Sequence, residues 1–83
     1  MEFIISNHAK KRIFERKLFL PSEINLVLTK NKIKKRVREI CKKNGFSSSL
    51  IYWRSNEKQP VIYVCEIIDI ATYKVITAFR LEN

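Results

Sequence analysis

Residues 61–81 read VIYVCEIIDIATYKVITAFRL, and this stretch determines the fold class that we expect. Val61 to Ile68 and Tyr73 to Leu81 are rich in β-branched and aromatic residues, which favour strands. The short segment 69–72 between them predicts a turn, so the two strands should form a hairpin. Because both strands are apolar on both faces, we expect them to lie in the interior of a sheet.

Two helices are predicted in the first third of the chain. Ser6 or Asn7 can accept hydrogen bonds from free backbone N–H groups, and the spacing of the apolar residues that follow predicts a helix to about Lys17. Ser22 follows a proline and is the expected cap of a second helix that ends near Asn31. The apolar stripe of this second helix would consist of Ile24, Val27 and Leu28.

Further strands are expected on both sides of these helices. Glu2 to Ile5 is a short segment that favours a strand, as does Leu50 to Arg54. Residues 33–43 fit either a helical stripe or a solvated strand, and we favour a strand from Arg36 to Cys41. We therefore expect one domain over residues 1–83 of the α+β class, with two N-terminal helices packed on a mostly antiparallel sheet of about four strands.

Positive charge is concentrated in the first half of the chain. Thirteen of the seventeen Lys and Arg residues lie in residues 1–43 with only four acids, so this half carries the whole net charge of +9. Nucleic acid is therefore the first partner to consider and an acidic protein the second. An anionic membrane is the least favoured, because the basic stretch lacks the broad apolar face of an interfacial helix.

The densest basic run is Lys30 to Lys43, where Glu39 is the single acid. Such a run can follow a phosphate backbone, although the same charges can simply keep a small protein soluble. The residues that we expect to contact RNA phosphates are Lys10, Lys11, Lys34, Lys35, Arg36, Arg38, Lys42 and Lys43.

The cysteines and the apolar runs indicate the cellular compartment in which we expect the protein. Cys41 and Cys65 stand far apart with only His8 to join them, so we expect reduced, packed thiols and neither a zinc site nor a disulfide. The longest apolar run, Val61 to Cys65, is too short for a signal peptide or a transmembrane span. We expect a cytoplasmic protein that needs no metal and no other cofactor.

The only histidine lies in the run SNHAKKRIFER at residues 6–16. On a helix His8, Arg12 and Arg16 would lie on one side, one turn apart. Metal-free RNA cleavage needs a base for the 2′-hydroxyl proton, an acid for the leaving oxygen and cations for the charge that develops on phosphorus. His8 can be either proton carrier, and guanidinium groups suit phosphate. Candidates for the second proton carrier are Tyr63, Tyr73 and Glu66.

Each of these residues also has a plainer interpretation. A single histidine near a helix N-terminus is more often a cap or a solvated side chain than a catalyst. The arginine stripe can be a solvated face or an ion-pair partner of Glu15. The aromatic residues of the strands are more often core than platforms for base stacking.

Two motifs resemble a known family. The pattern of Ser6, His8, Arg12 and Arg16, together with the segment VITAFR at residues 75–80, resembles the prokaryotic family called domain of unknown function 4258. That family is similar to RelE-type toxins, within the fold of barnase, EndoU, colicin E and RelE ribonucleases, which cleave without metal.

The resemblance adds two candidate site residues and departs from the family in two places. It implies roles for Thr77 and Arg80, although the period of two along a strand places these two on opposite faces unless a bulge intervenes, and of the two we favour Arg80. One departure is Lys17, at a position where the family usually has a small residue, and the other is a slightly longer link to the second helix. The middle of the chain, Lys32 to Ser49, has no clear counterpart in the family.

We expect from these observations a small basic protein that acts on RNA. The leading hypothesis is a metal-independent endoribonuclease of the toxin–antitoxin type, which acts on mRNA or structured RNA, either free or on the ribosome, and has an acidic antitoxin. The alternative is a non-catalytic module that holds nucleic acid or a protein in a regulatory or inhibitory role. A third hypothesis is a toxin that acts on a protein such as gyrase. The sequence has no carboxylate cluster of the kind that magnesium nucleases use.

Overall fold

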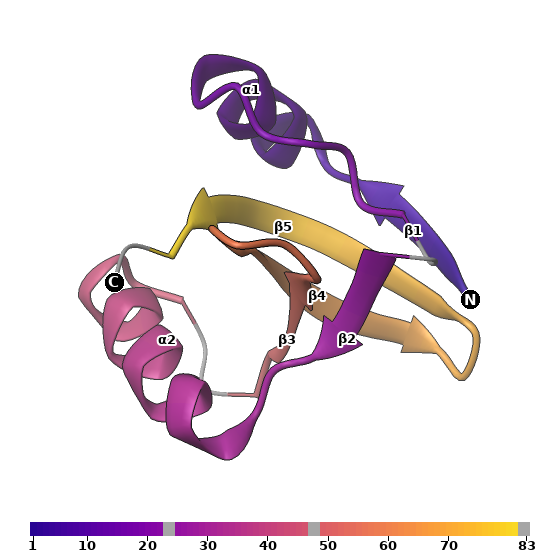
Figure 1. Ribbon diagram of the computed structural model, residues 1–83. Helices are drawn as coiled ribbons and strands as arrows, with labels where there is room; N and C mark the ends of the chain where they lie inside the picture. The colour runs from indigo at the N-terminus through magenta and orange to yellow at the C-terminus, as the bar shows by residue number, and fades with distance from the viewer. Residues whose placement is uncertain (23–24, 47–48, 82–83) are drawn as a thin grey trace.

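The computed structural model describes residues 1–22, 25–46 and 49–81, and within these ranges the chain forms two helices and one sheet of five strands (Figure 1). In chain order the elements are β1 (Glu2–Ile5), α1 (Asn7–Glu15), β2 (Leu26–Leu28), α2 (Asn31–Lys43), β3 (Ile51–Ser55), β4 (Val61–Asp69) and β5 (Thr72–Arg80). The strand order in the sheet is β1-β5-β4-β3-β2. β1 pairs with β5 in parallel, and the other pairs are antiparallel.

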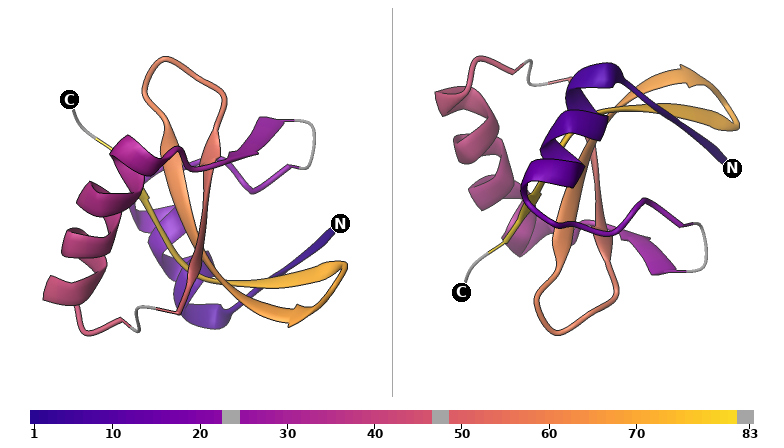
Figure 2. Two further views of the ribbon diagram at one scale, coloured as in Figure 1. Left: turned by 90° about the horizontal axis from the view of Figure 1, so that it is seen from below. Right: turned by 90° about the horizontal axis from the view of Figure 1, so that it is seen from above.

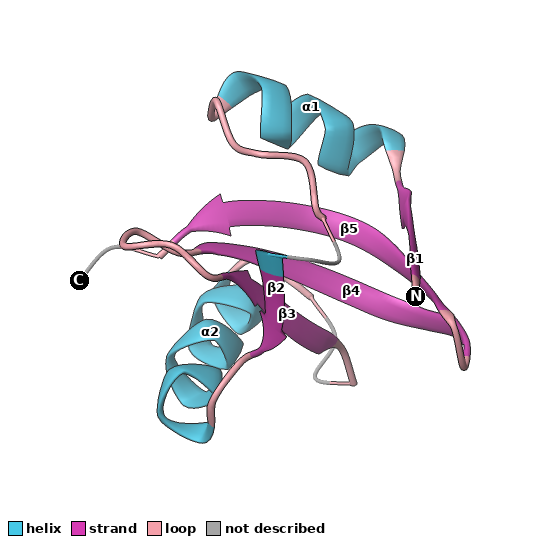
Figure 3. Ribbon diagram, turned by 45° about the vertical axis from the view of Figure 1, so that its right-hand side comes forward, coloured by secondary structure: helices cyan, strands magenta, loops and turns pink. Residues whose placement is uncertain are grey.

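The two helices cover opposite faces of the sheet (Figure 3). Side chains of the central strand β4 alternate between them, because successive residues of a strand point to opposite faces. Val61, Tyr63 and Cys65 pack with Ala9 and Ile13 of α1. The intervening residues of β4, Ile62 and Val64, pack with Val37 and Cys41 of α2. The protein therefore has three layers, with one helix on each side of the sheet.

The predicted hairpin is confirmed as β4 and β5, and the predicted strands at Glu2 to Ile5 and Leu50 to Arg54 are confirmed as β1 and β3 to within one residue. The predicted arrangement of helices and sheet is wrong. The sheet has five strands in a mixed arrangement rather than about four, and the helices lie between strands in the chain rather than together at the N-terminus. The fold remains α+β.

Two segments form a different secondary structure from the one predicted, and they account for this difference. In place of the predicted helix from Ser22 to Asn31, residues 26–28 form β2, an edge strand that pairs with β3 and buries Leu26. Ile24 of the expected stripe lies outside the described residues. The predicted strand from Arg36 to Cys41 is instead the centre of α2, because Val37 and Cys41, one turn apart, are both buried against the sheet.

α1 begins as expected and ends at a position of unusual geometry. The prediction of a cap at Ser6 or Asn7 is confirmed for Ser6, whose Oγ accepts a 3.1 Å hydrogen bond from the N–H of Ala9. After the helix, Lys17 has φ of 52°, in the left-handed region that favours glycine. The N–H of Leu18 then bonds back to the carbonyl of Ile13 at 2.9 Å, which closes the helix.

A bulge divides β5 into two parts. Val64 pairs with Thr77 and Cys65 pairs with Val75, so Ile76 is an extra residue on β5. The part before the bulge, residues 72–75, pairs with β1 on its other side. No strand of the described residues pairs with that side of β5 after the bulge, and this second part runs between α1 and α2 in both views of Figure 2.

Both cysteines are free and buried, on opposite faces of the sheet. Burial raises the pKa of the Cys65 thiol to about 12, and it also raises the pKa of Cys41. None of the described helices has the length and apolar character needed to span a membrane.

Candidate functional site

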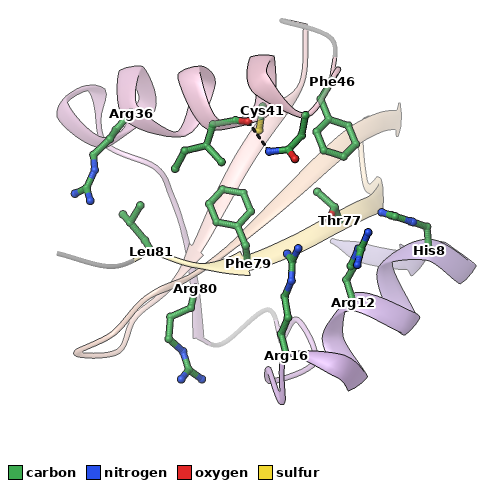
Figure 4. Close-up of a pocket in the computed structure, with 12 residues that line it drawn as sticks. His8, Arg12, Arg16, Arg36, Cys41, Phe46, Thr77, Phe79, Arg80 and Leu81 are labelled. Carbon is green, nitrogen blue, oxygen red and sulfur yellow. Dashed lines mark hydrogen bonds between the residues drawn. The ribbon is translucent and has the colours of Figure 1, made fainter.

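A groove of about 410 Å³ lies where α1, α2 and the second part of β5 meet (Figure 4). We call it the arginine groove. Its polar lining consists of His8, Arg12, Arg16, Arg36, Asn44, Thr77 and Arg80. Its apolar lining consists of Ile40, Cys41, Phe46, Phe79 and Leu81. The volume lies within the range of small-ligand sites, about 300 to 1,000 Å³.

Helix α1 and its C-cap Arg16 supply three of these residues from one side. Ala9 and Ile13 are buried against the sheet, so the neighbouring stripe at His8, Arg12 and Arg16 is turned toward the edge of β5. The predicted alignment of the three residues on one side of a helix is confirmed, and all three line the arginine groove. His8 is exposed, so a ligand in the groove can reach its imidazole.

The two arginines of α1 have different partners within the protein. Nη1 of Arg12 lies 3.2 Å from Oε2 of Glu15, in an exposed ion pair. Nη1 of Arg16 donates a 2.6 Å hydrogen bond to the backbone carbonyl of Ala78, on the part of β5 that pairs with β4 on one side and, among the described residues, with no strand on the other. Arg12 is therefore both an ion-pair partner of Glu15 and a groove residue, whereas Arg16 ties α1 to the sheet.

Strand β5 contributes residues from both of its faces. Thr77 and Phe79 point toward α2, and Arg80 points to the other side (Figure 4). The bulge at Ile76 precedes these residues, so it does not change the alternation between Thr77 and Arg80, and the prediction that they lie on opposite faces is confirmed. Both nevertheless line the arginine groove, because the groove extends around the open edge of β5.

Tyr63 lies outside the arginine groove. It is buried beneath α1, and its hydroxyl donates a 2.7 Å hydrogen bond to the carbonyl of Phe19. Burial, and to a smaller extent the charge of Glu57, raises the pKa of Tyr63 to about 12. The other candidates for a second proton carrier, Tyr73 and Glu66, do not line the groove either.

The basic residues predicted to contact RNA do not form one surface. Arg36 lines the arginine groove. Arg38 lies on the opposite side of α2, close enough to the phenol of Tyr52 to affect its titration. On α1, Lys11 lies 4.0 Å from Glu15 in an ion pair that is mostly exposed. Lys10 lies on the side of α1 away from His8. The remaining residues of the set are exposed or half-exposed on α2, and they are Lys34, Lys35, Lys42 and Lys43.

Several groove residues were not predicted from the sequence. Asn44 and Phe46 follow α2, and the side-chain Nδ2 of Asn44 donates a 2.8 Å hydrogen bond to the carbonyl of Ile40. Asn44 and Phe46 could be predicted to line the groove only if residues 31–43 were known to form a helix on the face of the sheet opposite α1. Phe79, within the motif at residues 75–80, is assigned only to the core by the sequence argument.

The fold and the groove define a small three-layer α+β domain with a cationic groove at the open edge of its sheet. The chain belongs to the family described as Domain of unknown function (DUF4258), whose model matches residues 5–80. A search of the curated proteins gave no match, and a search of the solved structures gave none. Among the described residues, no three His, Cys, Asp or Glu side chains lie close enough together to hold a metal ion.

Proposed function

We propose that this protein binds RNA in the arginine groove and cleaves it without a metal ion, as the likeness of its family to RelE-type ribonucleases implies. The observation that carries the proposal is the convergence of distant residues. The only histidine and four arginines come together in one groove, although they belong to α1, α2 and β5. These are His8, Arg12, Arg16, Arg36 and Arg80.

The charge of the groove suits a phosphodiester. Guanidinium groups stay charged at neutral pH and donate hydrogen bonds in a planar fork that matches phosphate oxygens. Four of them around one hollow give it a positive potential, which attracts an anion. Phe46 and Phe79 add apolar surface on which a sugar or a base can lie.

The proposed reaction uses the RNA's own nucleophile. His8 removes the proton of a 2′-hydroxyl, the 2′-oxygen attacks the adjacent phosphorus, and the bond from phosphorus to the 5′-oxygen breaks. The products are a 2′,3′-cyclic phosphate and a 5′-hydroxyl, which takes up a proton from His8 or from water. Arg12 and Arg80 stabilise the negative charge that develops on the phosphate oxygens.

One observation favours the second candidate, a non-catalytic RNA-binding module. Among the described residues that line the groove, His8 is the single side chain whose ordinary pKa lies near neutrality. Tyr63, Tyr73 and Glu66 lie elsewhere, so no second side chain is placed to complete acid–base catalysis. A binding module requires the cations and not the proton carrier.

Single-turnover cleavage measured beside RNA affinity separates the two candidates. For a nuclease, His8→Ala should slow cleavage by about two to four orders of magnitude and change affinity little. Asn7→Ala, next to His8 and outside the groove lining, is the matched control and should cleave normally. Cleavage should persist in EDTA. Binding without any cleavage, on naked RNA and in a translating extract alike, would establish the binding module instead.

A further inference from the structure

A second hollow, of about 480 Å³, lies on the other side of α1 from the arginine groove. We call it the apolar hollow. Ile13 and Phe14 of α1 form one side of it, and Leu18 and Leu20 of the segment that follows the helix form the other. Lys10 and Lys17 complete its lining, and they are its charged residues.

Three apolar side chains in or beside this hollow are unusually exposed, whereas Ile13 and Leu18 belong to the core. Phe14 is 84 % exposed and Leu20 is 64 % exposed, and the adjacent Phe19 is 57 % exposed. Single exposed apolar residues are common on protein surfaces, but a cluster of large ones beside a hollow is typical of an interaction site. The cluster contributes little to the core, since its side chains face solvent.

The net charge of the chain indicates whether the apolar hollow binds a second copy of this protein or a different protein. Two copies would each bring a net charge of +9, and a symmetric contact would place Lys10 and Lys17 of one copy near the same residues of the other. Like charges across an interface suppress association, whereas opposite charges favour it. An acidic partner would meet the two lysines with complementary charge.

The surroundings of the hollow favour a helix over an added strand. Its sides are a helix and a short loop, not a sheet edge, and backbone groups of the loop are already used. The N–H of Leu18 bonds to Ile13, and the carbonyl of Phe19 accepts from Tyr63. The hollow therefore offers apolar side chains and two cations rather than unpaired backbone, which suits an amphipathic helix.

We propose that the apolar hollow binds an amphipathic helical segment of an acidic partner protein. Leucine-like side chains of the segment would cover Phe14 and Leu20, with Asp or Glu side chains beside Lys10 and Lys17. His8, Arg12 and Arg16 lie on the other flank of α1, so the partner would occupy a surface separate from the arginine groove. This proposal does not depend on RNA binding.

A designed peptide tests it directly. The probe is a helical peptide of about 16 residues with Leu at positions i, i+3, i+4 and i+7 and Glu on the flanking positions. One control replaces each Glu by Lys, and a second scrambles the order. Fluorescence anisotropy gives the affinity, and ¹⁵N chemical shifts of the whole protein give the location. We expect only the acidic amphipathic peptide to bind, with shifts around Phe14 and Leu20.

Variants distinguish peptide binding at the apolar hollow from peptide binding at the arginine groove, whose positive charge also attracts acidic peptides. Phe14→Ser should weaken peptide binding by about tenfold or more, and the fold should tolerate it because the side chain is exposed. The double variant Lys10→Glu with Lys17→Glu should bind the control peptide, in which Lys replaces Glu, more tightly than it binds the acidic peptide. Arg36→Gln, in the groove, should leave peptide affinity unchanged.

Four outcomes would overturn the proposal. They are no binding of the acidic peptide at about 1 mM, equal binding of the scrambled peptide, shifts confined to the arginine groove, and a dimer of the wild type that Phe14→Ser dissociates in sedimentation. The last would identify a second copy as the occupant.

Discussion

The guanidinium of Arg16 donates a 2.6 Å hydrogen bond to the backbone carbonyl of Ala78, sixty-two residues away in the chain. This bond holds the C-terminal end of α1 against the part of β5 that, within the described residues, pairs with β4 but not with β1. Arg16 therefore fixes the distance between the α1 side of the arginine groove and the β5 side.

Removal of this bond should lower stability as well as function. A hydrogen bond from a charged donor contributes about 1.5 to 3 kcal/mol, and the partial exposure of this one places Arg16→Ala at the lower end, about 1.5 kcal/mol in urea unfolding. Arg12→Ala, which loses only an exposed ion pair, should cost less than about 0.5 kcal/mol. Equal losses in the two variants would contradict the positioning role of Arg16.

If RNA binds in the arginine groove as proposed, Glu15 should compete with it for Arg12. Its Oε2 lies 3.2 Å from Nη1 of Arg12, so binding of phosphate requires that the guanidinium share or leave this carboxylate. Glu15→Gln should therefore raise RNA affinity by about two- to fourfold at low salt. The matched control is Glu66→Gln, which removes the same charge from β4 outside the groove. An equal gain in both variants would show that only net charge matters.

Arg36 should contribute more to RNA binding than its basic neighbours on α2. It lines the arginine groove, whereas Lys35, two residues before the buried Val37, lies on the opposite side of the helix from the sheet. Arg36→Gln should lower affinity and reduce the slope of log affinity against log salt by about 0.7. Lys35→Gln, with the same loss of charge, should change the slope less. A larger effect at Lys35 would place the RNA on the outer face of α2.

Replacement of Lys17 by glycine should stabilise the protein. Lys17 has φ of 52°, where a side chain is strained and glycine is not, and the residue follows the C-cap of α1. We expect Lys17→Gly to raise the free energy of unfolding by about 0.5 to 1 kcal/mol. Lys10→Gly, within α1, should instead lower it by about 0.5 to 1 kcal/mol. Urea midpoints of the two variants test the sign directly.

Alkaline pH should destabilise the fold. Burial raises the pKa of Cys65 from 9.0 to about 12 and that of Tyr63 from 10.0 to about 12. Between about pH 9 and 12 the folded chain holds protons that the unfolded chain has lost, so stability falls as pH rises through this range. Cys65→Ala should be less stable at pH 7 and show a shallower alkaline fall. A fall as steep as that of the wild type would rule out Cys65 as a source.

The elements that could be predicted from the sequence are those specified by local pattern. The hairpin of β4 and β5 combines strand-forming residues with a short turn, and α1 has a cap at Ser6. The predictions for residues 26–28 and 36–41 are wrong, because a three-residue edge strand is defined by its partner β3 and an amphipathic stripe fits two structures until the covering surface is known.

Some residues of the candidate site could also be predicted from the sequence, and others could not. The positions of His8, Arg12 and Arg16 follow from helical spacing, and the resemblance pointed to Thr77 and Arg80. The role of Arg36 in the groove depends on α2 crossing the sheet opposite α1, which no local pattern encodes. Tyr63 was proposed for its chemistry alone, and its burial under α1 separates it from the groove.

Because Ile76 is an extra residue, the alternation of side chains between the two faces of the sheet is interrupted between the two parts of β5. Val75 and Ala78, three positions apart, both face α1, so the alternation restarts after the bulge. Deletion of Ile76 itself would leave Phe79 and Arg80 on their present faces, because Val75 and Thr77 already pair with successive residues of β4. A deletion after the bulge, such as that of Ala78, would instead turn Phe79 toward α1 and Arg80 toward α2. Length variation after the bulge should therefore be tolerated far less than substitution, and residues 77–80 are a constraint on spacing as much as on side-chain chemistry.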